Sequence, residues 1–380
     1  MPLFDVYPLF DIEPVKALGA YLWDRNGRKY LDLYGGHAVI SIGHSHPHYV
    51  QKISEQLGRI GFYSNSVKIP GQQEVAEKLG ALSGYDDYPL FLVNSGAEAN
   101  ENAFKLASFH TGRKKILSFS KAFHGRTSAA VAATDNPSII APVNESDQFL
   151  SVPFNDENAF EKIMSEEVAA VIIEGIQGVG GVQVPSTAFL QKIRSLCDRY
   201  GALMILDEVQ SGYGRAGTFF AHQESDVQAD IISMAKGMGN GFPIGGILIH
   251  PSITARHGML GTTFGGNHLA CAAAAAVLDV IKEEDLIANA SQTGALFTKE
   301  LTGRPGIRQV RGRGLMIGVE LEGPCAPVRQ ALLQEHGIFT GSSSDKNTIR
   351  ILPPLNIGEK EVNIFFDAFD KVLKKQNFEI

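Results

Sequence analysis

Residues 202–210 read Ala202-Leu203-Met204-Ile205-Leu206-Asp207-Glu208-Val209-Gln210, a short apolar run that ends in two acids. A continuous apolar run of this length predicts a strand that is buried on both faces, as in a parallel sheet. An acid at the end of such a strand is costly unless it meets a cation or a hydrogen-bond donor. The stretch therefore predicts both a buried sheet and a polar site at the end of one of its strands.

Comparable runs recur along the chain and alternate with amphipathic helical patterns. The runs are Leu90–Val93, Lys115–Phe119, Val168–Ile173, Ala202–Leu206, Ile231–Met234 and Gly246–Ile249. The clearest helical patterns are Gln72–Leu82, before the first run, and Ser186–Tyr200, which lies between two of the runs and is followed by Gly201 as a helix stop. This alternation is typical of an α/β fold with a largely parallel sheet.

After Gly266 the pattern changes to that of a second, smaller α+β unit. It predicts a long helix, two strands, a helix, a strand and a terminal helix. In this order, the ranges are Leu269–Ile281 for the long helix, Arg308–Val310 (approximately) and Met316–Leu321 for the two strands, Val328–Glu335 for the next helix, Thr348–Leu352 for the third strand and Lys360–Lys374 for the terminal helix.

Composition excludes several classes of protein. The 380 residues hold 34 Lys and Arg against 41 Asp and Glu, a net charge of −7, so no basic surface for nucleic acid or an anionic membrane is expected. The three cysteines form no CxxC pair, which favours a reducing compartment over a disulfide scaffold. No apolar run is long enough to span a bilayer and no signal peptide is evident, so we expect a cytoplasmic protein.

Because ligands of open parallel sheets bind at the carboxyl ends of the strands, the residues after each run are the candidates for a site. Leu90–Val93 is followed by Ser95-Gly96-Ala97-Glu98, an S-x-x-E capping box at a helix start that could bind a phosphate. Lys115–Phe119 is followed by Phe123 and Arg126, an aromatic ring that could stack on a planar ligand and a cation that could clamp a carboxylate. Taken alone, the helix start is as compatible with an ordinary capped helix, and the loop with Phe123 and Arg126 favours a structural role.

Two further strand ends carry the chemically active groups. Asp207 follows Leu206, and Lys236 follows Ile231–Met234. A lysine in a semi-apolar pocket can lose its proton and form a Schiff base with an aldehyde. A phosphate cradle, an aromatic ring, a buried acid and a lysine are together the parts needed to hold pyridoxal 5′-phosphate.

With these motifs in this order, the chain resembles the class III aminotransferases of fold type I over nearly its whole length. The matching stretches are Tyr30–Asp32, Gly43–Pro47, Asn94–Glu101, Ala122–Thr127, Leu206–Gly212, Lys236-Gly237, Gly261–Asn267 and Arg350–Leu355. The resemblance implies a large domain with a mostly parallel seven-stranded sheet flanked by helices, and a small α+β domain. It implies three parts of the chain. Residues 1–45 would be an N-terminal segment that packs with the small domain, residues 46–268 the large cofactor domain, and residues 269–380 a linking helix followed by the small domain.

The resemblance also assigns roles by position. Lys236 would form the Schiff base with the cofactor and then carry the proton of the substrate carbon, and Asp207 would pair with the pyridinium nitrogen. The other cofactor-binding residues would be Ser95, Gly96 and Ala97 at the phosphate, Phe123 on the ring face, Gln210 at the phenolic oxygen, and Thr263 at the phosphate of the neighbouring subunit. The substrate-binding residues would be Arg126 and Thr262 for the acylated amino acid and Arg350 for the carboxylate of the 2-oxo acid. Thr263 implies a homodimer with active sites at the subunit interface.

The implied reaction moves the δ-amino group of an N-acylornithine, either N-acetyl- or N-succinylornithine, to 2-oxoglutarate in arginine metabolism. Alternatives are another class III enzyme that acts on ornithine, 4-aminobutyrate or a semialdehyde, and a non-catalytic regulator that binds the cofactor. Intact Lys236 and Asp207 argue against the regulator.

One position departs from the family pattern. Where relatives carry a second glutamate in the stretch after Glu174, which masks the carboxylate-binding arginine, this chain has Val179. The hypothesis is that Arg350 stays unmasked, which would change the preference between ω-amino and α-amino donors. Glu174 itself is interpreted as structural.

The histidines His37, His44, His46 and His48 are close together in the sequence. We expect no metal site there, because no carboxylate accompanies the last three and Pro47 separates two of the candidate ligands.

Overall fold

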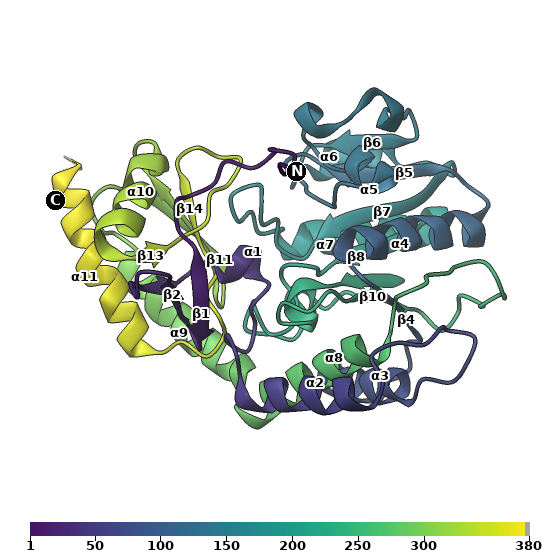
Figure 1. Ribbon diagram of the computed structural model, residues 1–380. Coiled ribbons are helices and arrows are strands. Elements are labelled where there is room, and N and C mark those ends of the chain that lie inside the picture. The colour runs from purple at the N-terminus through teal and green to yellow at the C-terminus, as the bar shows by residue number, and fades with distance from the viewer. Residues whose placement is uncertain (377–380) are drawn as a thin grey trace.

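The computed structural model describes residues 1–376, and its centre is one seven-stranded sheet (Figure 1). The strands are β4 (Leu90–Val93), β5 (Lys115–Phe119), β6 (Phe149–Val152), β7 (Val168–Glu174), β8 (Leu203–Asp207), β9 (Ile231–Met234) and β10 (Gly245–Ile249). Their order is β4-β10-β9-β8-β7-β5-β6, and every neighbouring pair is parallel except the two pairs that β10 makes. The predicted α/β fold with a mostly parallel seven-stranded sheet is confirmed.

Helices cover both faces of this sheet because its central strands are apolar on both faces. On β7, Val171 and Ile173 face the core that contains α7 (Thr187–Tyr200), whereas Ala170 and Ile172 face the core that contains α4 (Gly96–Thr111). Alternate residues of a strand point to opposite faces, so a continuous apolar run builds two cores at once. The short helices α5 (Ser128–Ala132) and α6 (Glu157–Ile163) follow β5 and β6 in the chain.

A helical layer lies along one side of the sheet and consists of α2 (Pro47–Arg59), α3 (Pro70–Ser83) and α8 (His268–Glu283), seen at the bottom of Figure 1. Gly71 lets α3 approach α8 closely, since a Cβ built on it would lie 2.9 Å from Cys271 Cβ. The helices predicted at 72–82 and 269–281 are both present.

The C-terminal residues form the second unit with its own antiparallel sheet. This three-stranded sheet has the order β11 (Ile307–Arg313), β12 (Met316–Leu321) and β14 (Thr348–Ile351). It packs with α9 (Leu286–Leu301), α10 (Cys325–His336) and α11 (Glu359–Lys375), the last of which buries Phe365, Phe366 and Phe369. These elements match the predicted α+β pattern except for α9, which the sequence analysis does not predict.

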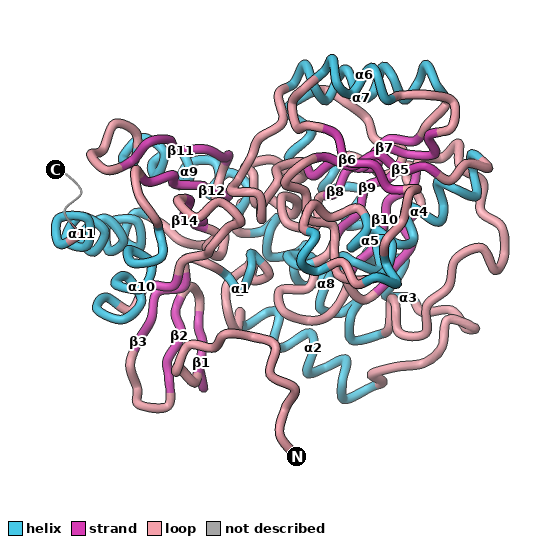
Figure 2. The backbone as a smooth tube through the Cα atoms, turned by 90° about the horizontal axis from the view of Figure 1, so that it is seen from above, coloured by secondary structure: helices cyan, strands magenta, loops and turns pink. Residues whose placement is uncertain are grey.

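The N-terminal residues join this second unit rather than the large sheet (Figures 1 and 2). The strands β1 (Pro14–Leu18), β2 (Tyr21–Asp24) and β3 (Lys29–Asp32) form a four-stranded sheet with β13 (Ile338–Phe339), which runs parallel to β3. A turn of helix, α1 (Gly35–Ala38), follows β3, and short 3₁₀ segments lie at 137–139, 142–144, 221–225 and 236–238. The division of the chain at 45 and 268 stays a prediction.

No helix among residues 1–376 is both long and apolar enough to cross a membrane.

Candidate functional site

A cavity of about 370 Å³ lies at the carboxyl ends of the parallel strands. Because β7 and β8 are parallel and in register, Glu174 and Asp207 stand side by side at this edge, and Lys236 follows the end of β9. Eight of the residues predicted from the sequence line the cavity: Ser95, Gly96, Ala97, Phe123, Arg126, Asp207, Gln210 and Lys236. Residues from four separate stretches of the chain thus meet in one place.

Asp207 is buried and held in one orientation by neutral and aromatic donors. Its Oδ2 accepts hydrogen bonds from Asn100 Nδ2 at 2.8 Å and lies 2.7 Å from His124 Nδ1, and its Oδ1 accepts from the Val209 N–H at 3.0 Å. Asn100 and His124 are also buried, and His124 Nε2 has no partner in the part of the chain that the structure describes. These contacts hold the Asp207 carboxylate in one orientation beside the cavity.

Lys236 is the nucleophile candidate. Its backbone has φ 45°, a left-handed conformation that is unfavourable for a lysine and typical of functional sites. Burial lowers the pKa of Lys236 to about 8, although the nearby charge of Asp207 acts in the opposite direction. Within residues 1–376 no hydrogen bond or ion pair holds its Nζ, so the amine is free to react.

The start of α4 forms one end of the cavity. Ser95 Oγ accepts a hydrogen bond from the Glu98 N–H at 3.2 Å, but Glu98 Oε2 accepts from the Asn94 N–H at 3.0 Å rather than from Ser95. The predicted capping box is therefore only half formed, because Glu98 reaches one residue further back. The N–H groups of Gly96 and Ala97 open the helix and have no acceptor within it, which makes this end an anion site.

Glu174 ties two loops to the end of β7. Its Oε1 accepts from the Phe123 N–H and its Oε2 from the Gly178 N–H, both at 3.0 Å. Burial raises the pKa of Glu174 to about 7, and His124 opposes this shift. The position of the Phe123 ring at the cavity thus depends on a carboxylate that sequence reasoning interpreted as structural only.

Arg350 lies behind the cavity wall rather than in it. Its Nη1 donates to Gln210 Oε1 at 3.3 Å and its Nε to the Ser342 carbonyl at 2.5 Å, while Gln210 Nε2 donates to the His37 carbonyl at 3.0 Å. Burial lowers the pKa of Arg350, and no carboxylate of the described chain pairs with it. The place where the family has its masking glutamate is occupied by Val179, which lines the cavity.

Thr262 and Thr263 are not at this cavity. Thr262 lines a second, open hollow of about 720 Å³ and lies 3.4 Å from Asn94 Nδ2, whereas Thr263 is exposed. The role of Thr262 toward the acylated amino acid and that of Thr263 toward the phosphate of a neighbouring subunit therefore stay predictions.

The histidines near the N-terminus bind separate carboxylates. His44 pairs with Asp32, His46 with Glu284 and His48 with Asp279. Among residues 1–376 no group of three or more His, Cys, Asp or Glu side chains is placed to hold a metal ion.

Comparison with known proteins agrees with this geometry. The sequence model of the family "Aminotransferase class-III" matches residues 6–373. The acetylornithine aminotransferase of Methanosarcina mazei is 41% identical over 362 residues, which cover 94% of this chain and 90% of the relative. The acetylornithine aminotransferase of Bacillus subtilis is 40% identical over 369 residues, with 95% and 94% covered.

Solved structures share the fold over the same length. The ornithine aminotransferase of Toxoplasma gondii ME49 has a TM-score of 0.91 at 29% identity and covers 98% of this chain and 93% of its own. The acetylornithine aminotransferase of Elizabethkingia anophelis has a TM-score of 0.85 at 32% identity, with 97% and 95% covered. Enzymes of this family use pyridoxal 5′-phosphate with an amino donor and a keto acid. With the family matched almost from end to end and relatives this similar, the chain belongs to the class-III aminotransferases.

Proposed function

We propose that this chain transfers the δ-amino group of an N-acylornithine to 2-oxoglutarate, with pyridoxal 5′-phosphate held in the cavity around Lys236. The observation that carries the chemistry is the convergence of Lys236, whose pKa is lowered to about 8, with the buried acid Asp207. Relatives named acetylornithine aminotransferase, about 40% identical over most of the chain, support the substrate class.

The side chains and backbone groups of the cavity fit this cofactor. The free N–H groups at the start of α4 suit a phosphate, the Phe123 ring suits an aromatic face, and Asp207 suits a protonated ring nitrogen. Gly96 leaves no room for a side chain between the helix start and Val209, because a Cβ there would lie 2.6 Å from Val209 Cγ1. When bound, the cofactor supplies an aldehyde and a ring that accepts the electron pair released at the substrate carbon.

The residues of the chain then have separate tasks. Lys236 Nζ would hold the cofactor through its aldehyde, with loss of water, and as a free amine it would move the proton of the substrate carbon to the former aldehyde carbon of the cofactor. The Asp207 carboxylate holds the proton on the ring nitrogen, since its own orientation is fixed by Asn100 and His124. Arg126, at the exposed side of the cavity, orients the carboxylate of the amino donor.

We further propose that the enzyme is a homodimer in which the loop with Thr263 completes the neighbouring site. In support, Thr263 and Phe264 are exposed, and neither lines the cavity of its own subunit.

The proposal is tested by a panel of half-reactions with acetylornithine, succinylornithine, ornithine and 4-aminobutyrate. Each donor is added to the cofactor-loaded enzyme, and the loss of the visible absorbance of the bound cofactor is followed. We expect an acylated ornithine to react fastest and Lys236→Ala to react with none. Faster reaction with ornithine or 4-aminobutyrate would refute the donor class, and full turnover by Lys236→Ala would refute the site.

A further inference from the structure

The loop at residues 177–183 borders the cavity through Val179 and contains a strained backbone position. It is closed by two backbone hydrogen bonds between Gln177 and Gln183, at 2.9 and 3.0 Å, and its tip carries Val179 into the cavity wall. Val182 has φ 56°, which is strongly disfavoured for a β-branched residue. Contacts from outside the loop must therefore hold it in place.

Part of this support is the three-stranded sheet of the second unit. Gly318 in β12 faces the loop, and a Cβ built on it would lie 2.8 Å from Val182 Cβ and 3.0 Å from the Gly181 carbonyl oxygen. The loop backbone thus rests directly on the strand, which only a glycine permits.

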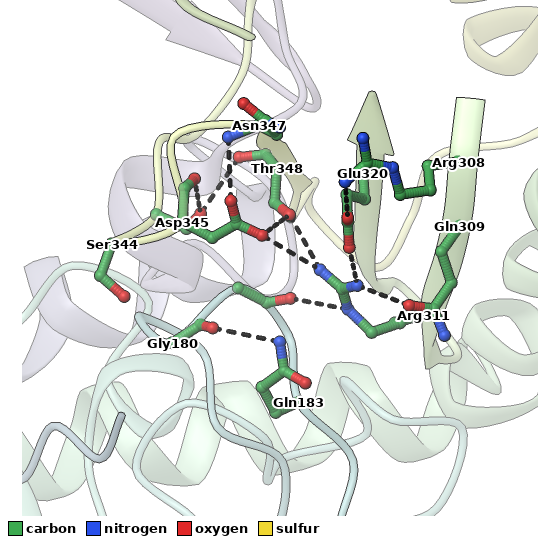
Figure 3. Close-up of polar contacts among 12 residues, drawn as sticks. Gly180, Gln183, Arg308, Gln309, Arg311, Glu320, Ser344, Asp345, Asn347 and Thr348 are labelled. Carbon is green, nitrogen blue, oxygen red and sulfur yellow. Dashed lines mark hydrogen bonds and ion pairs between the residues drawn. The ribbon is translucent and has the colours of Figure 1, made fainter. Parts of the chain in front are cut away.

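The other support is the guanidinium of Arg311 in β11, at the centre of Figure 3. Arg311 Nε donates to the Gly181 carbonyl at 3.2 Å, Nη1 to Gln309 Oε1 at 2.8 Å, and Nη2 to Thr348 Oγ1 at 2.8 Å. Nη1 also pairs with Glu320, and the side chain is only 11% exposed. A planar fork with several donors can fix several partners at once, which a lysine cannot do.

The same guanidinium also supports the loop that follows β13. Asp345 lies 3.7 Å from Arg311 Nη2 and accepts a hydrogen bond from Thr348 Oγ1 at 2.7 Å. In this second loop, the Ser344 N–H donates to the Val179 carbonyl at 2.8 Å, and the Ser342 carbonyl accepts from Arg350 Nε. Arg311 therefore sits where the loop with Val179 and the loop that orients Arg350 meet.

We propose that Arg311 is a positioning residue that sets the distance between the Val179 wall and Arg350, and thereby the affinity for substrate carboxylates, without touching the substrate. This inference rests on the proposed function. Lys236, Asp207 and the start of α4 lie outside both anchored loops, so loss of the Arg311 contacts should weaken substrate binding far more than cofactor binding.

The test compares Arg311→Gln with Arg308→Gln as a matched control. Arg308 also reaches Glu320, at 3.3 Å, but it is 57% exposed and contacts neither loop. For the donor that the wild type turns over fastest, we expect Arg311→Gln to raise KM about 10-fold with kcat changed less than about 3-fold. Arg308→Gln should match the wild type, and Arg311→Lys should recover only part of the loss.

A second readout avoids turnover altogether. The affinity of the cofactor-loaded enzyme for glutarate, a dicarboxylate without a reactive group, is measured from the change in cofactor absorbance. We expect this affinity to fall about 10-fold in Arg311→Gln, while the Kd for pyridoxal 5′-phosphate changes less than about 3-fold. Gly318→Ala, which displaces the loop from the other side, should reproduce the same pattern if Arg311→Gln does not fold.

The proposal is overturned if Arg311→Gln and Gly318→Ala behave like Arg308→Gln in both KM and glutarate affinity. It is also overturned if these variants lose cofactor affinity as much as substrate affinity, since that would be general structural damage. A wild type that prefers a donor other than an acylornithine would refute the proposed function but not this inference, because the comparison uses whichever donor is fastest.

Discussion

At the scale of single residues, the pKa of Lys236 has a measurable consequence. An amine reacts with an aldehyde only when it is unprotonated. Because burial lowers the pKa of Lys236 from 10.5 to about 8, its amine should react at lower pH than that of an ordinary lysine. We expect cofactor-free protein to capture pyridoxal 5′-phosphate with a rate that rises with pH and is half-maximal near 8. Borohydride trapping and mass spectrometry of the Lys236 peptide would measure this rate.

The Asp207→Asn variant supplies the control for this pH dependence. The Asp207 carboxylate raises the pKa of Lys236 against the larger effect of burial, so removing its charge should move the midpoint to still lower pH. If the pH midpoint of the wild type stayed near that of a free lysine peptide, the burial of Lys236 would be contradicted.

Lys236 and Asp207 could be placed at the cavity from the sequence because, with the other strand-end motifs, they complete a set of groups that suits one cofactor. Glu174 also ends a predicted strand, but its sequence position does not reveal the two loops that it holds, and Asn100 carries no comparable signal. Asn100 is 107 residues from the carboxylate that it holds, and nothing in its own helix shows which strand end it faces. Likewise, the five donors of Arg311 acquire a role only through contacts between loops distant in the chain.

At the scale of elements, the packing of α4 against the loop after β8 predicts a rescue experiment. A methyl group at position 96 would lie 2.6 Å from Val209 Cγ1, so Gly96→Ala should destabilise the protein by about 1–3 kcal/mol and weaken cofactor binding. Adding Val209→Ala removes the clash. We expect the double variant to recover most of both losses in thermal unfolding and cofactor titration, and purely additive effects would contradict the contact.

The predicted elements agree with the structure where the apolar pattern is strong and differ where it is weak. The run Phe149–Val152 was missed because β6 is an edge strand whose residues are only partly covered, with an exposed Ser151. The strands β7 and β8 continue through Glu174 and Asp207, acids that a hydrophobic pattern leaves outside. The antiparallel direction of β10 follows from its place between β9 and β4, which no local pattern reveals.

At the scale of the whole molecule, an exposed apolar cluster predicts where two subunits meet. Phe62 and Phe264 are in ring contact at 5.2 Å yet 42% and 59% exposed, and Phe264 is next to Thr263. Contiguous apolar surface of this kind marks interaction sites. We expect Phe264→Asp to give monomers with weakened cofactor binding, as measured by light scattering and cofactor titration.

Val143→Asp is the matched control, because Val143 is 88% exposed but far along the chain from this cluster. Val143→Asp should leave the molecular mass of the oligomer in solution and the cofactor affinity unchanged. Persistence of a dimer in Phe264→Asp at wild-type concentrations would place the interface elsewhere.

The pairing of β3 with β13 also matters while the protein is being made. Leu31 and Asp32 pair with Ile338 and Phe339, so the N-terminal sheet cannot be completed until about 300 more residues have left the ribosome. At a synthesis rate of about 5–20 residues per second, the edge of β3 stays unpaired for roughly 15–60 s. During that time the nascent chain exposes an unpaired strand edge that can pair with other chains. Folding of the two ends is therefore a late, post-synthetic event, and chains truncated before residue 338 should depend on chaperones far more than the full-length protein does.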